Sequence, residues 1–348
     1  MSNTTAKNDK NRVLFAALDP YLETAIPAPV QKESAGRGYV PYGTDNLYPQ
    51  FLLSLYSDCS TLKAIIDGNV DYVMGDNFVL DADLDRYYAA EVMREIIRDW
   101  YIFGYAFLQV LRNPYGEVVD IVRLPAEWVR TDKEHQAFWY CEKWKGYGTS
   151  KAVVYPTFFS EARQPSSVLM LGSGRGVYPA PLWSAAIKDA EIERKIETYH
   201  LNEISNNFLT SLLINFNNGV PSDSVKEEIA RNLEEKHSGA ENAGRFLLSF
   251  NENVQNRTTI ERLGTDDFDK RYEALAKRTR EQLMVAFKAQ PILFGLTSET
   301  NTGFSTTEFG DLFKLYNKTM ISPRQDMLKM AFAKIYGRDV LTIQPFTI

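Results

Sequence analysis

The residue types that could perform catalysis are few in this sequence and lie far apart. Carboxylates recur at close spacing in two places, namely Asp67, Asp71 and Asp76, and Glu191, Glu193 and Glu197. With a divalent metal ion, such groups could serve an enzyme that acts on nucleic acid. A solvated helix face is the commoner reason for closely spaced acidic residues, and no nucleophile elbow, HExxH or CxxC motif accompanies them. The sequence therefore offers little to an enzyme, and a metal-dependent enzyme is kept as the alternative.

Two further features of the sequence superficially suggest ligand binding. The glycine-rich stretch 171–176 resembles a phosphate loop, but it lacks Walker spacing and its lysine. It leads into Tyr178-Pro179 rather than directly into a helix N-terminus, so we expect a connector. The histidines are His135, His200 and His237, each without a second histidine or cysteine at ligand spacing. We expect neither a metal site nor a cofactor.

The charge balance bears on nucleic-acid binding. A net charge of -6 argues against a protein that clamps nucleic acid through its phosphates, because that task normally needs a basic face. Aromatic and basic side chains that could stack on bases occur in one region, at Trp139, Tyr140, Lys143, Trp144, Lys145 and Tyr147. In antiparallel sheets such residues more commonly pack across strands, which is the interpretation that we prefer.

Composition bounds the fold class. The 348 residues, 44% of them hydrophobic and 24% charged, are enough for a real core and for two or three lobes. Cys59 and Cys141 form no paired motif, so we expect packed thiols in a reducing compartment. The first twelve residues are polar, lack an apolar signal core and are expected to be a disordered arm. The most apolar run, 100–111, is too short to cross a bilayer, and we expect no membrane contact.

Hydrophobic periodicity places helices before strands in the first half of the chain. Pro49 marks the start of one helix, a second follows the break at Cys59 and ends at Gly75, and residues 83–100 predict a third. Residues 106–111 and 118–124 predict a hairpin around the turn 113–116. Short strands at 127–131, 137–142, 151–155 and 168–171 complete a small antiparallel sheet. These elements predict an α+β fold.

The second half predicts two long helices that flank an insert. One helix begins after Pro181 and reaches about residue 207, and the other runs from Asp266 to Gln290, where Pro291 ends it. Their predicted buried sides comprise Ala185, Ile192, Ile196 and Tyr199, and Phe268, Tyr272, Leu275, Thr279, Leu283 and Ala286. The insert predicts strands at 211–216, 246–250 and 258–263 and a helix at 224–236 with a capping box at Ser224 and Glu227. Such an arrangement projects a small domain from a body. A last helix opens at 305–308 and reaches residue 336, with a kink at Pro323.

Motifs along residues 40–335 resemble those of tailed-phage portal proteins, particularly portals of phages of Bacteroidetes. The motifs are YGTDNLYP at 42–49, Leu53, Ser60, GDNF at 75–78, FGYAF at 103–107, Arg112-Asn113, Leu124-Pro125, YPAPL at 178–182, residues 208–216, ENAGR at 241–245, QPILFGL at 290–296, Asn301, Glu308, Phe313 and ISP at 321–323. They are individually loose, but they occur in the family's order. The resemblance implies a structural protein with no catalytic site.

The resemblance also implies a division of the chain. It assigns an N-terminal arm to 1–40, a helical and antiparallel-β wing to 41–177, a first stem helix to 178–208, a small α/β clip to 209–264, a second stem helix to 265–290, a tunnel-loop region to 291–305, a long kinked wing helix to 306–336 and a tail to 337–348. A helical crown is expected to be absent or minimal. The implied assembly is a ring, usually of twelve subunits, at one capsid vertex of the virion. DNA is packaged and ejected through it.

The implied partners are neighbouring subunits, double-stranded DNA, the terminase, a head-tail adaptor and the major capsid protein; another head-tail connector component is the nearer alternative. Residues expected at the interface between subunits, on the stem helices, are Glu191, Glu193, Glu197, Lys277, Arg278 and Arg280. Residues expected to dock partners on the clip are Lys226, Glu227, Glu234, Glu235 and Asn242. The tunnel loop is expected to comprise Thr297, Ser298, Glu299, Thr300, Asn301, Thr302, Gly303 and Phe304 and to face the DNA.

Overall fold

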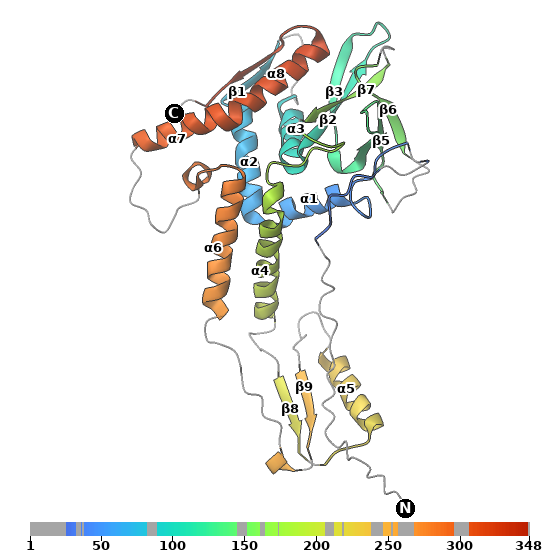
Figure 1. Ribbon diagram of the computed structural model, residues 1–348, viewed down its shortest axis with the longest axis vertical. Coiled ribbons are helices and arrows are strands. Elements are labelled where there is room, and N and C mark those ends of the chain that lie inside the picture. The colour runs from blue at the N-terminus through green and yellow to red at the C-terminus, as the bar shows by residue number, and fades with distance from the viewer. Residues whose placement is uncertain are drawn as a thin grey trace, which may run out of the picture. The chain divides into compact units, whose positions relative to one another are not determined.

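The computed structural model describes residues 26–32, 36, 38–81, 89–144, 152–160, 164–172, 174–205, 212–217, 219–237, 246–251, 253–256, 268–295 and 306–346. The chain divides into two compact units. Unit 1 comprises Met1–Ala25 and Lys195–Leu275, and unit 2 comprises Ile26–Arg194 and Ala276–Ile348. Each unit is described by itself. Figure 1 labels the elements.

Three helices form the first layer of unit 2, at the positions that periodicity predicts. They are α1 (Tyr48–Asp58), α2 (Ser60–Met74) and α3 (Ala89–Phe103). Pro49 lies in the first turn of α1, where its missing N–H costs nothing, and extended Cys59 separates α1 from α2. The predicted start of the third helix, 83–88, lies outside the described residues.

Strands of unit 2 form two three-stranded antiparallel sheets rather than the one predicted sheet. One has the order β3-β2-β7, from β2 (Tyr105–Arg112), β3 (Val118–Leu124) and β7 (Ser166–Gly172). The other has the order β4-β5-β6, from β4 (Val129–Thr131), β5 (Ala137–Tyr140) and β6 (Val153–Pro156). Pro125 and the 3-10 turn η1 (Ala126–Trp128) interrupt the chain between β3 and β4, which separates the sheets. Phe107 and Phe138, whose ring centroids lie 5.5 Å apart, pack one sheet against the other.

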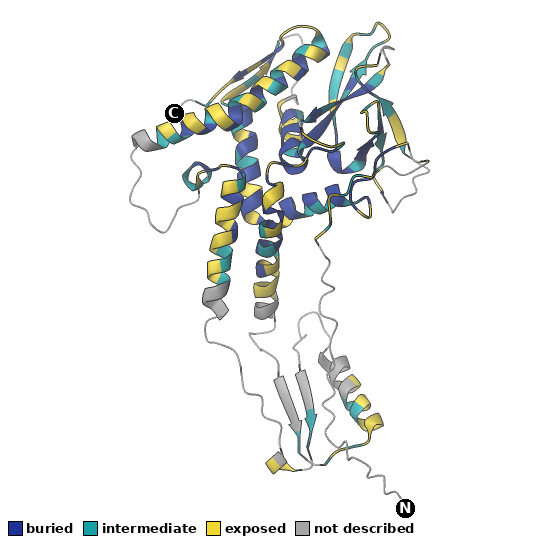
Figure 2. Ribbon diagram, in the orientation of Figure 1, coloured by how far each residue is buried: buried dark blue, intermediate teal, exposed yellow. Residues whose placement is uncertain are grey.

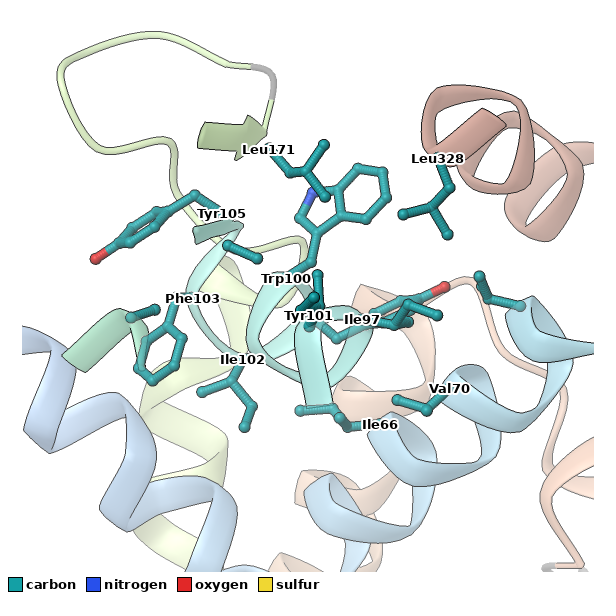
Figure 3. Close-up of a cluster of buried hydrophobic side chains, with 14 of the residues drawn as sticks. Ile66, Val70, Ile97, Trp100, Tyr101, Ile102, Phe103, Tyr105, Leu171 and Leu328 are labelled. Carbon is teal, nitrogen blue, oxygen red and sulfur yellow. The ribbon is translucent and has the colours of Figure 1, made fainter. Parts of the chain in front are cut away.

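The core of unit 2 surrounds α3. Trp100 and Tyr101 lie among Ile66 and Val70 of α2 and Leu328 of the C-terminal helix, as Figure 3 shows. Figure 2 shows that buried residues dominate α2, α3 and β2. Because β2 is the central strand of its sheet and is covered on both faces, Tyr105, Ala106, Phe107 and Leu108 are all buried.

The C-terminal helix contains an irregular turn where the sequence predicts a kink. It consists of α7 (Thr306–Tyr316), the π-helical turn η5 (Asn317–Ile321) and α8 (Ser322–Tyr336), with Pro323 in the first turn of α8. A π turn accommodates one extra residue and relieves the clash between a proline ring and the preceding turn. The buried side therefore continues across it, and Gln325 of α8 donates to the carbonyl oxygen of Val73 at the end of α2 (3.1 Å).

One pair of strands was not predicted. β10 (Leu341–Gln344), in the segment expected to be a tail, pairs antiparallel with β1 (Asn77–Leu80). Gly75 permits this pairing because it has φ +69° and because a Cβ there would lie 2.1 Å from the carbonyl oxygen of Gln344. Leu341 and Ile343 are buried and alternate with exposed residues. This alternation of apolar and polar residues is the pattern from which the strand could have been predicted.

Unit 1 contains a parallel strand pair and a helix in its described part. β8 (Leu212–Phe216) pairs with β9 (Phe246–Phe250), and α5 (Asp223–His237) lies between them in sequence, followed after β9 by the 3-10 turn η3 (Val254–Asn256). α5 begins before Ser224, so the predicted capping box is wrong; the carbonyl oxygen of Ser222 instead accepts from the N–H groups of Val225 and Lys226. The predicted strand 258–263 and residues 1–25 of the predicted N-terminal arm, 1–40, lie outside the described residues.

A buried guanidinium joins the start of α1 to the second sheet. Arg130 is fully buried, and its Nε and one terminal nitrogen donate to the side-chain oxygen (2.8 Å) and carbonyl oxygen (2.6 Å) of Asn46. Its remaining donors reach the carbonyl oxygens of Val129 (2.8 Å) and Glu127 (3.1 Å) and the side chain of Gln50. Burial lowers the pKa of Arg130 from its ordinary value. All five N–H donors have partners, so the cation is solvated by the protein instead of by water.

We expect Arg130→Lys to lower the free energy of unfolding by about 3 kcal/mol, because an ammonium group cannot reach the same oxygens and leaves them unpaired. Urea unfolding followed by tryptophan fluorescence measures the change. The matched control is Arg98→Lys at the partly exposed pair with Asp67 (3.2 Å), which should cost under about 1 kcal/mol. Equal losses in the two variants would contradict the role given to Arg130.

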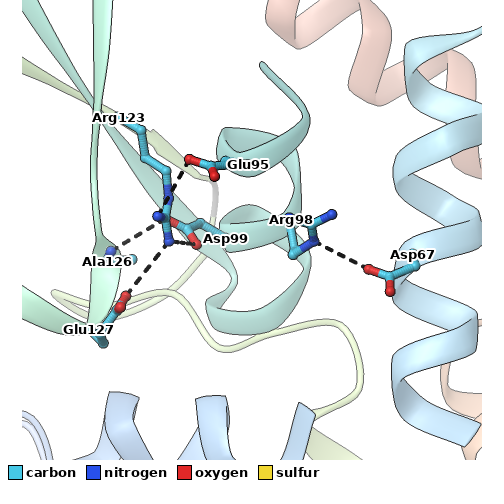
Figure 4. A network of polar contacts seen from close by, with 7 residues as sticks. All are labelled: Asp67, Glu95, Arg98, Asp99, Arg123, Ala126 and Glu127. Atoms are coloured by element: carbon cyan, nitrogen blue, oxygen red, sulfur yellow. Dashed lines mark hydrogen bonds and ion pairs between the residues drawn. The ribbon is translucent and has the colours of Figure 1, made fainter. Parts of the chain in front are cut away.

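Three carboxylates share one guanidinium between α3 and the first sheet (Figure 4). Arg123 donates to both oxygens of buried Asp99 (2.7 and 2.8 Å), while Glu95 and Glu127 lie 3.7 and 4.0 Å from its terminal nitrogens. Burial raises the pKa of Asp99 to about 6, although Arg123 opposes the shift. The folded protein therefore binds this proton more tightly than the unfolded chain, whose aspartate has its ordinary pKa.

The contribution of Asp99 to stability should be fully present below about pH 4 and should be lost as the pH rises through about 6. The side-chain amide of the Asp99→Asn variant cannot ionise, so the stability of the wild type minus that of the variant should fall between pH 4 and pH 7. Urea midpoints of both proteins across this range provide the measurement. A difference that stays constant, or that grows with pH, would show that the shift has the opposite sign or is absent.

Candidate functional site

The helix pair α4 (Ile187–Ser205) and α6 (Phe268–Ala286) carries the residues that the sequence assigned to subunit contacts. Before α4, the aromatic rings of Tyr178 and Trp183 are fully buried. The indole N–H of Trp183 donates to the carbonyl oxygen of Tyr101 (3.0 Å), and the hydroxyl of Tyr178 bonds to the backbone of Val40 and Thr131. The 3-10 turn η2 (Ser184–Ala186) then leads into α4. The chain thus enters α4 from a fixed position in unit 2.

Glu193 of α4 caps the N-terminus of α2. One of its carboxylate oxygens accepts from the backbone N–H of Thr61 (3.1 Å) and from the hydroxyl of Ser60 (3.2 Å). The N-cap residue Cys59 makes no capping hydrogen bond through its side chain. A carboxylate supplies both a missing acceptor and a charge that the helix dipole favours. Glu193 therefore fixes α4 against α2 by a contact between residues 132 positions apart in sequence.

Arg194 and Glu191 extend this contact to the end of α1. Glu191 is buried and pairs with Arg194 (2.6 Å), which also lies 3.4 Å from Asp58 and donates to the hydroxyl of Ser54. The expectation of a solvated face is therefore wrong for Glu191 and Glu193, whose carboxylates are buried within their own chain. Glu197, one turn further, is exposed as expected. The local sequence of α4 could not show these contacts, because their partners on α1 and α2 lie more than 130 residues away along the chain.

The buried side of α4 also differs from its predicted one. Ile196 is buried as predicted, but Ala185 and Tyr199 are exposed, and Ala186, Ile187 and Ala190 are buried instead. On α6 the prediction is confirmed for Thr279 and Leu283, which are fully buried. The buried side of α4 was predicted incorrectly because two of the positions that face α1 and α2 hold charged residues, Glu191 and Glu193, instead of apolar ones.

Aromatic rings join the two helices within unit 1. Tyr199 of α4 stacks on Tyr272 of α6 with ring centroids 4.7 Å apart and an interplanar angle of 25°, and the ring of His200 lies 5.9 Å from Tyr272. Lys277, Arg278 and Arg280 are exposed on α6. Their role and that of Glu197 at a subunit interface stays a prediction.

Two aspartates of the enzyme alternative are paired with arginines. Asp67 accepts from Arg98 and from the hydroxyl of Tyr56, and Asp71 pairs with Arg94. Within the described ranges, no three or more His, Cys, Asp or Glu side chains are grouped as a metal site would require. His135 bonds through Nε2 to the carbonyl oxygen of Val177, which directly follows the glycine-rich stretch (2.8 Å). A cleft of about 390 Å³ beside that stretch is lined mainly by aromatic and polar side chains and by three glycines.

The aromatic residues proposed for base stacking pack within the protein. Trp144 is buried and lies over the guanidinium of Arg130 (5.0 Å), and its ring contacts that of Tyr39 (5.1 Å). Trp139 also contacts Tyr39, and Tyr140 contacts Trp128. These contacts confirm the packing interpretation for the described residues; Tyr147 lies outside them.

Several predicted site residues lie outside the part of the chain that the structure describes. The tunnel loop, 297–304, and Asn242 lie outside the described residues, as do the side chains of Glu234 and Glu235. Lys226 is bound to Asp223 (2.9 Å), and Glu227 is exposed. Among the helices that are described, none combines the length and apolarity needed to span a bilayer.

Removing the cap on α2 should have a local signature. We expect Glu193→Ala to lower the free energy of unfolding by about 1–2 kcal/mol and to speed amide exchange at the first turn of α2, because the N–H of Thr61 loses its acceptor. Hydrogen–deuterium exchange with peptide resolution measures this effect. Glu281→Ala, at an exposed glutamate of α6, is the control and should leave α2 unchanged. Unchanged protection of residues 60–63 in Glu193→Ala would contradict the capping role.

Comparison with known proteins assigns the fold. Similar solved structures include a chain in the neck of an empty GTA (gene transfer agent) particle, computed with C6 symmetry, at 14% identity and a TM-score of 0.55 over 85% of this chain and 84% of that one. The neck of a native GTA particle computed with C12 symmetry gives 14% identity and a TM-score of 0.53 over 85% and 84%. An HK97 family phage portal protein from Corynebacterium diphtheriae gives 12% identity and a TM-score of 0.50 over 85% and 95%.

At these identities the likeness concerns the fold alone. No protein of curated function matches the chain in sequence. The family model for phage portal proteins matches residues 85–339, which include every described element from α3 to α8. The chain therefore belongs to the phage portal protein family.

Proposed function

We propose that this chain forms a closed ring at one vertex of a tailed-phage head and serves as the conduit for DNA packaging and ejection. The observation that carries the proposal is the family match over residues 85–339. A head-tail connector needs a stable scaffold and no catalytic centre. The buried ionic and apolar contacts of α4 and α6 suit such a scaffold, and Asp67 and Asp71 of the enzyme alternative are paired with arginines.

The finer division of the chain is part of this proposal. α4 and α6 are the two stem helices, β8, α5 and β9 belong to a clip that spans 209–264, and the two sheets with α1–α3 and α7–α8 form the wing, with the crown absent or minimal. The order of elements supports it, because two long helices bracket the α/β insert in sequence. Kinship with portals of phages of Bacteroidetes rests on the sequence motifs.

The place of the ring is the neck of the virion. Two of the similar chains come from particle necks, one computed with C6 and the other with C12 symmetry, and a ring of twelve copies is compatible with both symmetries. The terminase, a head-tail adaptor and the major capsid protein are the proposed partners. The loop 297–304 is proposed to face the DNA, where Glu299 and several hydroxyl side chains avoid the multiple phosphate-neutralising contacts that would hold DNA fast.

Assembly is the direct test of the ring. Twelve copies of 39.7 kDa give a mass of about 476 kDa, which native mass spectrometry resolves from a monomer. A different closed copy number would favour another head-tail connector component. A protein that stays monomeric at high concentration, also when co-expressed with its scaffold or capsid protein, would refute the proposal.

We further expect Lys277→Glu, Arg278→Glu and Arg280→Glu together to reduce the fraction of chain in rings at least about tenfold, because the reversed charges would repel the proposed acidic partner Glu197 of a neighbouring subunit. Native mass spectrometry at low salt measures the fraction. The control reverses exposed Lys314 and Lys334 of α7 and α8. Unaltered assembly by the triple variant, at a stability equal to that of wild type, would remove these residues from the interface.

A further inference from the structure

Tyr115 is an exposed aromatic residue on a rigid turn. It lies in the turn between β2 and β3 of unit 2, and 87% of its surface is exposed. The side-chain oxygen of Asn113 accepts from the backbone N–H groups of Tyr115 and Glu117 (3.0 Å each), and the N–H of Gly116 donates to the carbonyl oxygen of Asn113 (2.9 Å). Such bonds hold a turn in one conformation. Tyr115 is therefore presented to the surroundings from a fixed backbone.

A cleft in the same unit has the size and the lining to take a phenol ring. Its volume of about 390 Å³ lies within the roughly 300–1,000 Å³ of sites that bind small organic groups. Phe138, Phe159, Met170 and Pro179 supply apolar surface, and Glu134 supplies a carboxylate that accepts hydrogen bonds. Because Phe138 is 1% exposed and Phe159 is 63% exposed, the cleft leads from the core to the surface.

Hydrogen bonds fix the turn that forms one wall of the cleft. The side chain of Asp132 accepts from the backbone N–H groups of Gln136 (2.7 Å) and Ala137 (3.1 Å). His135, which adopts φ +54°, bonds through Nε2 to the carbonyl oxygen of Val177 (2.8 Å) and ties this turn to the chain that follows the glycine-rich stretch. Binding in the cleft therefore requires little further ordering of the protein.

The turn that carries Tyr115 and the cleft lie at different places on one sheet. The turn follows Arg112 at one end of β2, whereas Gly172, which lines the cleft, pairs with Tyr105 at the other end. The exposure of Tyr115 shows that its ring does not occupy the cleft of its own chain. A contact that joins two different surfaces of identical chains is heterologous, and such contacts close into a ring when the rotation between subunits permits.

We propose that Tyr115 of each subunit inserts into this cleft of a neighbouring subunit, so that the partner of the cleft is a second copy of the chain. The inference rests on the proposed function, in which the chain forms a closed ring, and it adds a contact in unit 2 to those proposed on α4 and α6. Of the Phe, Trp and Tyr residues that the structure describes, Tyr115 and Phe159 are the most exposed. Insertion would bury both, and aromatic residues are enriched among the anchors of protein interfaces.

The charges at the two surfaces are compatible with this contact. Glu117 is exposed two residues after Tyr115, and Arg175 is exposed between two glycines that line the cleft. Opposite charges at the rim of an interface favour the encounter and fix its register. The carboxylate of Glu134, which also lines the cleft, can accept a hydrogen bond from the phenol hydroxyl of Tyr115.

Photo-cross-linking in assembled rings tests the contact directly. The photoreactive residue p-benzoylphenylalanine replaces Tyr115 in the full-length chain, and purified rings are illuminated. We expect a covalent dimer of twice 39.7 kDa, about 79 kDa, in which residue 115 is joined to the segments 134–138, 157–159 or 170–179. Peptide mass spectrometry identifies the joined segments. The same replacement at Met330, which is 57% exposed on α8, is the matched control and should give no link to the cleft.

A substitution tests whether the contact contributes to assembly. At a concentration where half of the wild-type chain is in rings, Tyr115→Ser should lower the fraction in rings at least about tenfold, because the interface loses an aromatic anchor. Arg175→Glu, which brings a second carboxylate close to Glu117 of the neighbour, should also lower it. Native mass spectrometry measures the fraction. The urea midpoint of Tyr115→Ser should equal that of the wild type, since the residue is exposed.

The other outcomes separate this contact from the ring itself. A wild-type chain that forms no rings would refute the proposed function. Rings that form normally with Tyr115→Ser, or that give no covalent dimer on illumination, would overturn the inserted tyrosine while leaving the proposed function intact. Cross-links from residue 115 to another part of the neighbouring chain, or to the capsid protein in purified heads, would give Tyr115 a different partner and would likewise overturn the inference.

Discussion

The burial of Arg130 is the constraint on which the architecture of unit 2 depends. A guanidinium away from water must have an acceptor for every N–H, and here the acceptors come from Asn46, Gln50, Glu127 and Val129. The approach to α1, the start of α1 and the turn before β4 must therefore all converge on one point. Asn46 adopts φ +65° to present both its oxygens, which an asparagine tolerates better than most residues.

The entry to α4 follows from this convergence. Thr131, next to Arg130, donates its N–H to the hydroxyl of Tyr178, and the ring of Tyr178 stacks on Tyr42 with centroids 4.7 Å apart. Gln31 bonds to both the N–H and the carbonyl oxygen of Tyr178. The residue that opens the path to α4 is thus held from three directions, so the path of the chain into α4 is fixed by contacts that originate around the buried cation.

Sequence periodicity predicted where many helices and strands lie, but it did not predict which of them contact one another. α1, α2, the β2–β3 hairpin and the order of helix, insert and helix follow from local spacing of apolar residues, turn residues and prolines, which act over a few positions. The cap that Glu193 places on α2, the burial of Glu191 and the pairing of β1 with β10 depend on contacts across more than a hundred residues. A glutamate in a charged helix has the same local pattern whether it is solvated or buried, so its site role could not be read from spacing.

The parts of α4 and α6 that belong to unit 2 are held by different sets of contacts. α4 combines buried Ile187 and Ala190 with ionic contacts, namely Glu193 on the N-terminus of α2 and Arg194 between Glu191 and Asp58. α6 ends in apolar contacts, with Leu283, Met284 and Phe287 buried. Directional ionic contacts specify the angle at which a helix leaves, whereas apolar contacts resist its withdrawal without specifying a direction so sharply. The ionic contacts of α4 therefore set its orientation on α1 and α2, and the buried apolar residues of both helices add stability.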